Sequence, residues 1–84
     1  MRVPTRGTEE KTFAERLGRV LALRRVQNGY SQEDIAYHLG LTQTQISRFE
    51  MGRQWPGLKH LVALADFYSE PLAAIIDDAE HWGE

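Results

Sequence analysis

The stretch Gln32–Met51, QEDIAYHLGLTQTQISRFEM, decides the fold of this 84-residue chain. It holds two short amphipathic segments, and only Gly40 and Leu41 separate Leu39 from Thr42, where the second segment begins. So short a link cannot place two helices antiparallel and side by side. It therefore predicts two helices that cross steeply, at about 90–120°.

The same stretch supplies what such a crossing needs in order to pack. Ala36 is a small residue where the helices touch, and Gly40 allows a tight turn between them. A third element must cover the apolar residues that both segments place on their inner faces. These apolar residues are Ile35, Leu39, Leu41, Ile46 and Phe49.

Helix start and stop signals outside this stretch predict three further helices. Thr12 with Glu15 forms a capping box, and Asn28-Gly29 is a stop signal, so the first helix is expected over about 12–27. Ser31 is expected to cap the second helix, and Thr42 the third, with Gln45 as its capping-box partner. The fourth is expected after Pro56-Gly57, with Leu58, Leu61, Val62, Leu64, Ala65 and Phe67 or Tyr68 as its apolar residues. The fifth is expected from Ser69-Glu70-Pro71, with Pro71 in its first turn.

The expected fold class is thus all-α, with five helices and a helix-turn-helix formed by the second and third. The chain divides into a flexible arm at 1–11, one domain at 12–78 and an acidic tail at 79–84. No cysteine is present, and the longest apolar runs are far shorter than the roughly 20 residues of a membrane span. These features exclude disulfide-stapled and transmembrane classes and predict a cytoplasmic protein.

The charge is distributed unevenly along the chain. Residues 1–59 carry ten Lys and Arg against six acids, a net +4, whereas residues 60–84 carry six acids and no Lys or Arg, a net −6. A pI of about 5.9 argues against a general nucleic-acid binder, but the basic part leaves one face that could meet a polyanion. The alternative for the acidic end is that it is only solvated.

The third helix presents a polar face of unusual composition. With Ile46 and Phe49 inward, four side chains point outward and a fifth, Gln45, lies on the flank; the four are Gln43, Thr44, Ser47 and Arg48. A solvated face would more often use Glu and Lys. Amide and hydroxyl groups in the first turn of a helix are suited to base edges in the major groove, and an arginine one turn later to guanine or phosphate.

The chain resembles the lambda repressor and Cro family, also called the Xre family. The resemblance spans Leu17–Ile76 and is carried by QEDIAYHLGLTQTQISRFEM, by the GYSQ lead-in at Gly29–Gln32, by ISRFEMGR at Ile46–Arg53 and by the Pro-x-Leu restart at Pro56–Leu58. It implies a five-helix, usually dimeric protein that binds double-stranded DNA sequence-specifically and regulates transcription, here as a nucleoid-associated repressor.

The resemblance also implies roles for particular residues. Gln43, Thr44 and Arg48 match base-reading positions, and Gln45 and Ser47 are further candidates. Gln32 is expected to contact phosphate and to brace Gln43, and Arg25 and Glu50 to form a structural ion pair. The expected phosphate contacts are Gln32, Thr42, Arg53 and Lys59, and Arg2 and Arg6 of the arm could enter a minor groove.

This sequence departs from the family pattern near the end of the third helix. Met51 stands where relatives often have asparagine. The methionine either loses a hydrogen bond to a backbone phosphate or serves to pack against its neighbours. Gly57 stands where relatives often have a capping serine. Trp55 is expected to pack on Phe49, with a place flanking the DNA as the alternative.

A dimer would read two half-sites of a palindrome about 34–36 Å apart. Its interface is expected in the fifth helix and the tail. The alternative is that the same residues close the core of the monomer and form no interface. The dimer candidates are Phe67, Tyr68, Leu72, Ile75, Ile76 and Trp82.

A rival interpretation is a protein-interaction module, such as a toxin-neutralising antitoxin, with weak or partner-dependent DNA binding. An enzyme is not expected, because His38, His60 and His81 lack ligand spacing and Asp77, Asp78 and Glu80 resemble a solvated helix end. No metal or cofactor is therefore predicted. The sequence leaves open the operator, the sign of regulation, the effector or partner, and a phage, antitoxin, restriction-controller or host origin.

Overall fold

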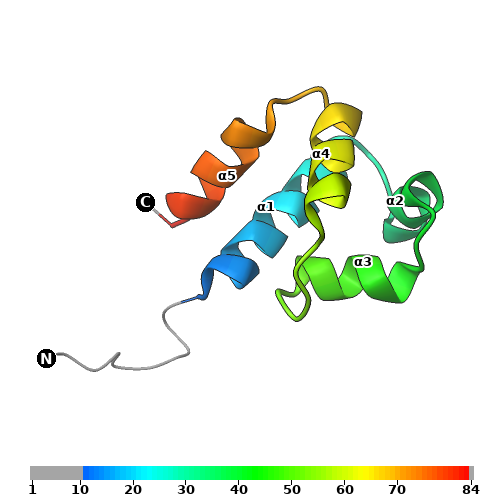
Figure 1. Ribbon diagram of the computed structural model, residues 1–84, viewed down its shortest axis with the longest axis horizontal. Coiled ribbons are helices and arrows are strands. Elements are labelled where there is room, and N and C mark those ends of the chain that lie inside the picture. Colours follow the sequence, from blue (N-terminus) through cyan, green and yellow to red (C-terminus); the bar gives the residue numbers. More distant parts are fainter. Residues whose placement is uncertain (1–10, 84) are drawn as a thin grey trace, which may run out of the picture.

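The computed structural model describes residues 11–83, and this part of the chain forms five helices and no strand. The arm expected at 1–11, with Arg2 and Arg6, lies outside the described residues apart from Lys11. The all-α prediction is confirmed (Figure 1). The helices are α1 (Phe13–Gln27), α2 (Gln32–Leu39), α3 (Gln43–Glu50), α4 (Leu58–Phe67) and α5 (Leu72–Glu80).

Capping boxes fix where the first three helices begin. In each one the N-cap hydroxyl accepts a backbone N–H three residues on, and the side chain at that third residue accepts the N-cap's own N–H. An N-cap of this kind contributes about 1 kcal/mol to helix stability. The three boxes are Thr12–Glu15, Ser31–Asp34 and Thr42–Gln45. The first and third confirm predicted pairs.

The α2–α3 turn brings the two helices of the predicted motif together at one tight bend. Gly40 adopts a left-handed conformation with φ of 68°, which a residue with a Cβ rarely adopts. The next amide, of Leu41, donates to the carbonyl of Ala36 at 2.9 Å. The short link therefore holds α3 at a fixed angle to α2.

The core lies around α1, which runs through the middle of the molecule with α5 along one side and α2–α3 on the other (Figure 1). Every helix contributes buried apolar side chains to one cluster. Its members are Leu17, Val20, Leu21, Ile35, Ala36, Ile46, Phe49, Leu64, Ala65, Tyr68, Ile75 and Ala79. Leu58 and Val62, expected among the apolar residues of α4, are instead 70% and 44% exposed.

Gly18 lets α1 and α3 approach each other more closely than any side chain would allow. A Cβ at this position would lie 2.4 Å from the carbonyl oxygen of Glu50 and 2.5 Å from that of Phe49. Both are backbone atoms at the end of α3, so they cannot move without moving the helix. The contact sets where α3 sits on the domain, and the sequence analysis did not single it out.

Helix α5 extends past the boundary that was expected between domain and tail. The boundary placed after residue 78 falls inside α5, which continues to Glu80. Ala79 is fully buried, and its carbonyl accepts a hydrogen bond from Arg16 Nε at 2.9 Å. Pro71 is the N-cap of α5 and lies before its first turn, since its ψ of 142° is extended and not helical. The domain therefore includes residues assigned to the tail.

Two of the proposed dimer residues belong to the monomer core. Ile75 has no exposed surface and Tyr68 only 7%, so neither is available to a second copy. Burial also raises the pKa of Tyr68. Trp55 differs from expectation as well, because its ring stacks on Phe13, 6.1 Å between centroids, and not on Phe49.

An arginine clamp that the sequence analysis did not foresee joins α1 to the C-terminal part. Arg24 donates to both carboxylate oxygens of Glu70, at 2.6 and 3.0 Å, and to Asp78 on α5. These hydrogen bonds raise the pKa of Arg24. None of the helices in residues 11–83 is long and apolar enough to cross a membrane.

Candidate nucleic-acid interface

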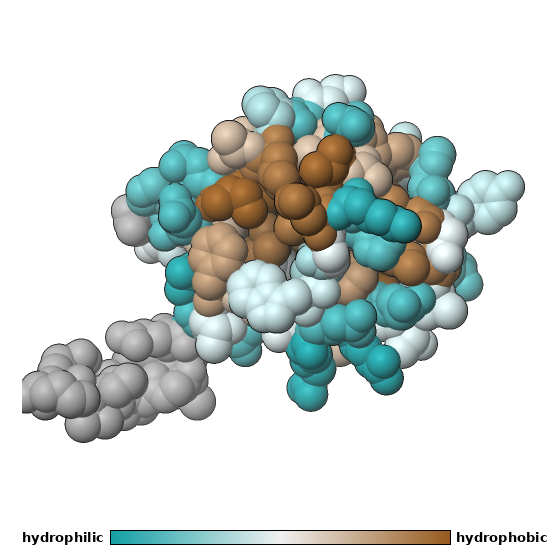
Figure 2. Space-filling model, viewed as in Figure 1, coloured by the Kyte–Doolittle hydropathy of each residue, from teal (hydrophilic) through white to brown (hydrophobic). Residues whose placement is uncertain are grey.

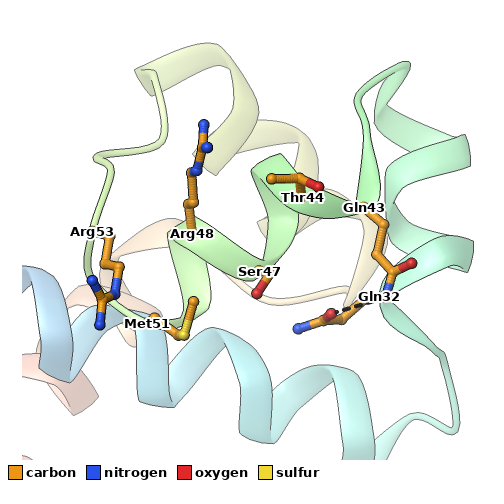
Figure 3. Close-up of a pocket in the computed structure, with 7 residues that line it drawn as sticks. All are labelled: Gln32, Gln43, Thr44, Ser47, Arg48, Met51 and Arg53. Carbon is orange, nitrogen blue, oxygen red and sulfur yellow. Dashed lines mark hydrogen bonds between the residues drawn. The ribbon is translucent and has the colours of Figure 1, made fainter.

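An open pocket runs along the exposed side of α3 and gathers most of the predicted DNA-contacting residues. It is lined by Gln32, Gln43, Thr44, Ser47, Arg48, Met51 and Arg53 (Figure 3). All but Met51 were proposed from the sequence as base or phosphate contacts. Three separate elements, α2, α3 and the loop after α3, therefore contribute to one surface.

The amphipathicity of α3 explains why these side chains face outward. Ile46 and Phe49 are buried against the core, which turns the opposite side of this helix toward solvent. Thr44 and Arg48, one turn apart, extend from the same side of α3 (Figure 3). A protruding helix of this kind leaves its first turn and one full side free for a ligand.

A chain of hydrogen bonds links this surface to the domain core. Gln43 Nε2 donates to Gln32 Oε1 at 3.3 Å (Figure 3). Gln32 Nε2 donates to Glu50 Oε1 at 2.9 Å. Glu50 in turn accepts from Arg25, at 2.7 Å from Nε and 3.0 Å from Nη2. The first residue of α3 is thereby joined to the first of α2, the last of α3 and the end of α1.

The ion pair at the inner end of this chain is shielded from water. The Glu50 side chain is 8% exposed and that of Arg25 15%, and Arg25 also donates to the carbonyl of Tyr30 at 2.9 Å. The hydrogen bonds to Glu50 raise the pKa of Arg25. A shielded bidentate pair fixes geometry more surely than it adds stability. Here it holds α1, the α1–α2 loop and α3 in one arrangement.

Three of the expected DNA contacts lie outside the pocket. Gln45 is half-buried, and its Oε1 accepts from the N–H of Thr42 at 2.9 Å, so both residues serve the capping box in the free protein. Lys59 is exposed on α4 and does not line the pocket. None of these three residues lines the α3 pocket.

Two basic residues that the sequence analysis missed extend the surface. Lys11 and Arg19 line a second pocket of about 230 Å³, which shares Met51 and Arg53 with the first. Glu15 and Glu50 also line it, but their carboxylates are engaged by the Thr12 cap and by Arg25. The positive charge of residues 1–59 was the available signal, but the sequence could not show that Lys11, before α1, and Arg19, within it, lie beside the end of α3.

The combined surface has the chemistry of a polyanion-binding face with polar readers at its centre. The α3 pocket contains two arginines, two glutamines, a threonine and a serine, and no carboxylate. Arginine forks suit phosphate or guanine, and amides and hydroxyls suit the donor and acceptor groups of base edges. The acids of α4 and α5 do not line either pocket.

Two of the three histidines contact aromatic rings. The His38 ring contacts Phe67, 4.2 Å between centroids, and the His60 ring lies 6.2 Å from Phe49. Within residues 11–83 no group of three or more His, Asp or Glu side chains could hold a metal ion.

A family model described as helix-turn-helix matches residues 21–75. The transcriptional repressor RstR of the cryptic phage CTXphi, from Vibrio cholerae, is 34% identical over 56 residues. That match covers 67% of this chain and 50% of the repressor, so this chain spans about half the length of that relative.

Solved structures of regulators share the fold. The clp gene regulator ClgR from C. glutamicum superposes with a TM-score of 0.79 at 20% identity, covering 89% of this chain and 97% of the other. The restriction-modification controller C.AhdI from Aeromonas hydrophila gives 0.68 at 24% identity, covering 74% and 94%. The DNA-binding domain of BldD gives 0.65 at 26% identity, covering 75% and 92%.

Proposed function

The chain belongs to the helix-turn-helix family of Xre and lambda-repressor type, and on that premise we propose that it is a dimeric, sequence-specific transcriptional repressor. It reads a palindromic operator by inserting α3 into the major groove, and it acts in the cytoplasm, on the nucleoid. The observation that carries this proposal is the gathering of Gln43, Thr44, Ser47 and Arg48 on one open, carboxylate-free surface.

Base reading is assigned to the first turn and the exposed side of α3. Gln43, the first residue of the helix, reaches a base edge with its amide, and Thr44 offers a methyl to thymine or a hydroxyl to either edge. Arg48 lies one turn on and reaches guanine or a phosphate. Ser47 lies between them in the same pocket and adds a further hydrogen-bonding group.

Phosphate contacts flank the readers on both sides. Gln32 at the start of α2 lies on one side, with Arg53 beyond the end of α3 on the other. Lys11 and Arg19, which line the pocket next to Arg53, extend the contact along the backbone. Such contacts position the protein without carrying sequence information.

Dimerisation is assigned to the side formed by α4 and α5. A single module of this kind buries only about 600–1,000 Å² on DNA, so a second copy is needed for tight specific binding. Figure 2 shows hydrophobic side chains gathered over α4 and α5 on the face in view. Of the predicted dimer residues, those that keep exposed surface are Phe67, Leu72, Ile76 and Trp82, and α4 adds the exposed Leu58 and Val62.

Replacement of Gln43 by alanine tests the docking of α3. We expect binding to fall by about 1–3 kcal/mol at one base-pair position per half-site, with preference relaxed at that position alone. Arg53→Ala is the contrast, since it should weaken all sequences alike and flatten the dependence on log salt by about 1. Titrations of a panel of single-base operator variants separate the two. Unchanged preference in Gln43→Ala would show that α3 is docked differently.

A further inference from the structure

We infer that two copies of this chain join by antiparallel pairing of α4 with α4, in which Lys59 of each copy binds Asp66 of the partner subunit. The two helices meet between Val62 and Ala63. The inference rests on the proposed function and deepens it, because it names the contact between the copies. It concerns the outer side of α4, which lines neither pocket of the nucleic-acid interface.

The outer side of α4 is apolar at its centre. The helix turns Leu64 and Ala65 into the core and so presents the opposite side to solvent. On that side Val62 is 44% exposed, and Leu58, one turn before it, is 70% exposed. Ala63, next to Val62, carries only a methyl group and lets another helix approach closely. A second helix laid on this side would remove the apolar surface from water.

Two opposite charges flank this apolar centre. Lys59 and Asp66 lie two turns apart on the same side of α4, about 10 Å along its axis. Both are exposed, and neither has an ion-pair partner among residues 11–83. Each also stands at the end of α4 where the helix dipole disfavours its charge, the lysine in the first turn and the aspartate in the last.

An antiparallel second copy reverses both of these unfavourable placements. When the helices cross between positions 62 and 63, position 59 faces position 66 of the other copy, because the two lie equally far from the crossing point. Lys59 then lies beside the negative end of the partner helix and next to the partner subunit's Asp66. The two-fold axis repeats the contact, so two ion pairs form. A parallel pairing would instead set Lys59 against the same lysine and Asp66 against the same aspartate.

The surface around α4 supplies further contact area. A specific dimer buries at least about 1,200 Å² in total, which is more than two short helices cover alone. Helix α5 packs beside α4, and Figure 2 shows hydrophobic side chains of both helices gathered on one face. The half-buried Leu72 and Ile76 of α5 therefore border the α4 pair.

Reversal of the two charges tests the pairing in the purified full chain without DNA. Lys59→Glu or Asp66→Lys alone sets like charges opposite each other at both contacts, so we expect each to raise the dimer Kd about 10-fold or more at low salt. A mixture of the two variants restores opposite charges at both contacts and should associate as tightly as the wild type. Sedimentation equilibrium measures all three.

Glu33→Lys is the control for these reversals, because it makes the same change in charge as Asp66→Lys at an exposed position of α2. It should leave the dimer Kd unchanged, and its mixture with Lys59→Glu should associate no better than Lys59→Glu alone. Single reversals with the wild-type Kd would overturn the pairing. So would a mixture of Lys59→Glu and Asp66→Lys that associates no better than either variant by itself.

Val62→Asp tests the apolar centre of the same contact. A carboxylate at this position would meet its own copy across the two-fold axis, so we expect a monomer at concentrations where the wild type is a dimer. Val26→Asp, at a valine of α1 that is 61% exposed, is the matched control and should stay dimeric. Far-UV circular dichroism checks that both variants keep their helices. A dimeric Val62→Asp would overturn the pairing.

Measurement in the absence of DNA separates this inference from the proposed function. A dimer that both reversals disrupt, combined with no sequence preference in any DNA, would support the pairing and refute operator reading. A palindromic operator bound by a dimer that withstands both reversals would refute the pairing alone.

Discussion

At the scale of single residues, Gly18 determines how closely the end of α3 packs against α1. Its missing side chain allows the α1 backbone to meet the carbonyls of Phe49 and Glu50 directly. The same end of α3 carries Glu50, which pairs with Arg25. Displacement of this contact would therefore disturb both the packing and the ion pair that hold α3 against the core.

Gly18→Ala tests the close contact between α1 and α3. Although alanine favours helices, its Cβ would lie under 3 Å from backbone atoms, so we expect a loss of about 1–3 kcal/mol in the free energy of unfolding. Urea denaturation measures the loss. Arg19→Ala, at the exposed position next along the helix, is the control and should change stability by about 0.5 kcal/mol or less. A stabilised Gly18→Ala would contradict the contact.

At the scale of elements, each of the first three helices is positioned by its own capping box. Side chains three residues apart form each box, so the Thr12 and Thr42 boxes could be predicted from the sequence and are confirmed. The boxes of the first two helices contain carboxylates, Glu15 and Asp34, so the stability of these caps depends on pH. The backbone hydrogen bond from Thr12 lowers the pKa of Glu15, and that from Ser31 lowers the pKa of Asp34.

The lowered pKa values predict loss of helix capping in acid. Glu15 binds protons more weakly in the folded state than in the unfolded state, so its contribution is complete above its ordinary pKa of 4.5 and is lost as the pH falls through the lower folded value. A carboxyl NMR titration should give a midpoint below 4.5 for Glu15. Glu15→Gln, which keeps the accepting oxygen, should reduce the fall in stability between about pH 4.5 and 3. A midpoint at or above 4.5 would contradict the box.

At the scale of the whole molecule, the C-terminal part is joined to α1 by contacts that no local pattern shows. Ala79 and Ile75 are fully buried, and Arg24 connects α1 to Glu70 and Asp78. Residues 46 and 54 positions apart form these ion pairs, so no local sequence pattern could indicate them. Two of the acids in the C-terminal part, Glu70 and Asp78, are therefore ion-pair partners of Arg24.

Arg24→Met tests this clamp. Methionine keeps the apolar stem but leaves Glu70 and Asp78 without their shared cation, so we expect a loss of about 1–2 kcal/mol, moderated by the exposure of both acids. Thermal unfolding at low and high salt measures it, and the difference from wild type should shrink as salt rises. Arg19→Met, at an exposed arginine without a carboxylate within ion-pair distance in residues 11–83, should have little effect. Equal effects of both substitutions would contradict the clamp.

The helices and the outward face of α3 could be predicted because both follow from local spacing. Gln43, Thr44 and Arg48 were assigned from their positions relative to Ile46 and Phe49, and the structure brings them into one pocket. Gly18, Arg24 and the cations Lys11 and Arg19 were missed because their partners are distant in the chain. The burial of Tyr68 and Ile75 could not be predicted, because an apolar sequence pattern looks the same whether it closes a core or a dimer.

Selection from a random double-stranded DNA library tests the central claim most directly. At about 150 mM salt, where non-specific binding is weak, we predict an enriched palindrome with half-sites about 10–10.5 base pairs apart, and with one position in each half lost in Gln43→Ala. An enriched single half-site would contradict the dimer but would still support base reading by α3. No enrichment would contradict sequence-specific binding and favour a protein-interaction module on the same scaffold.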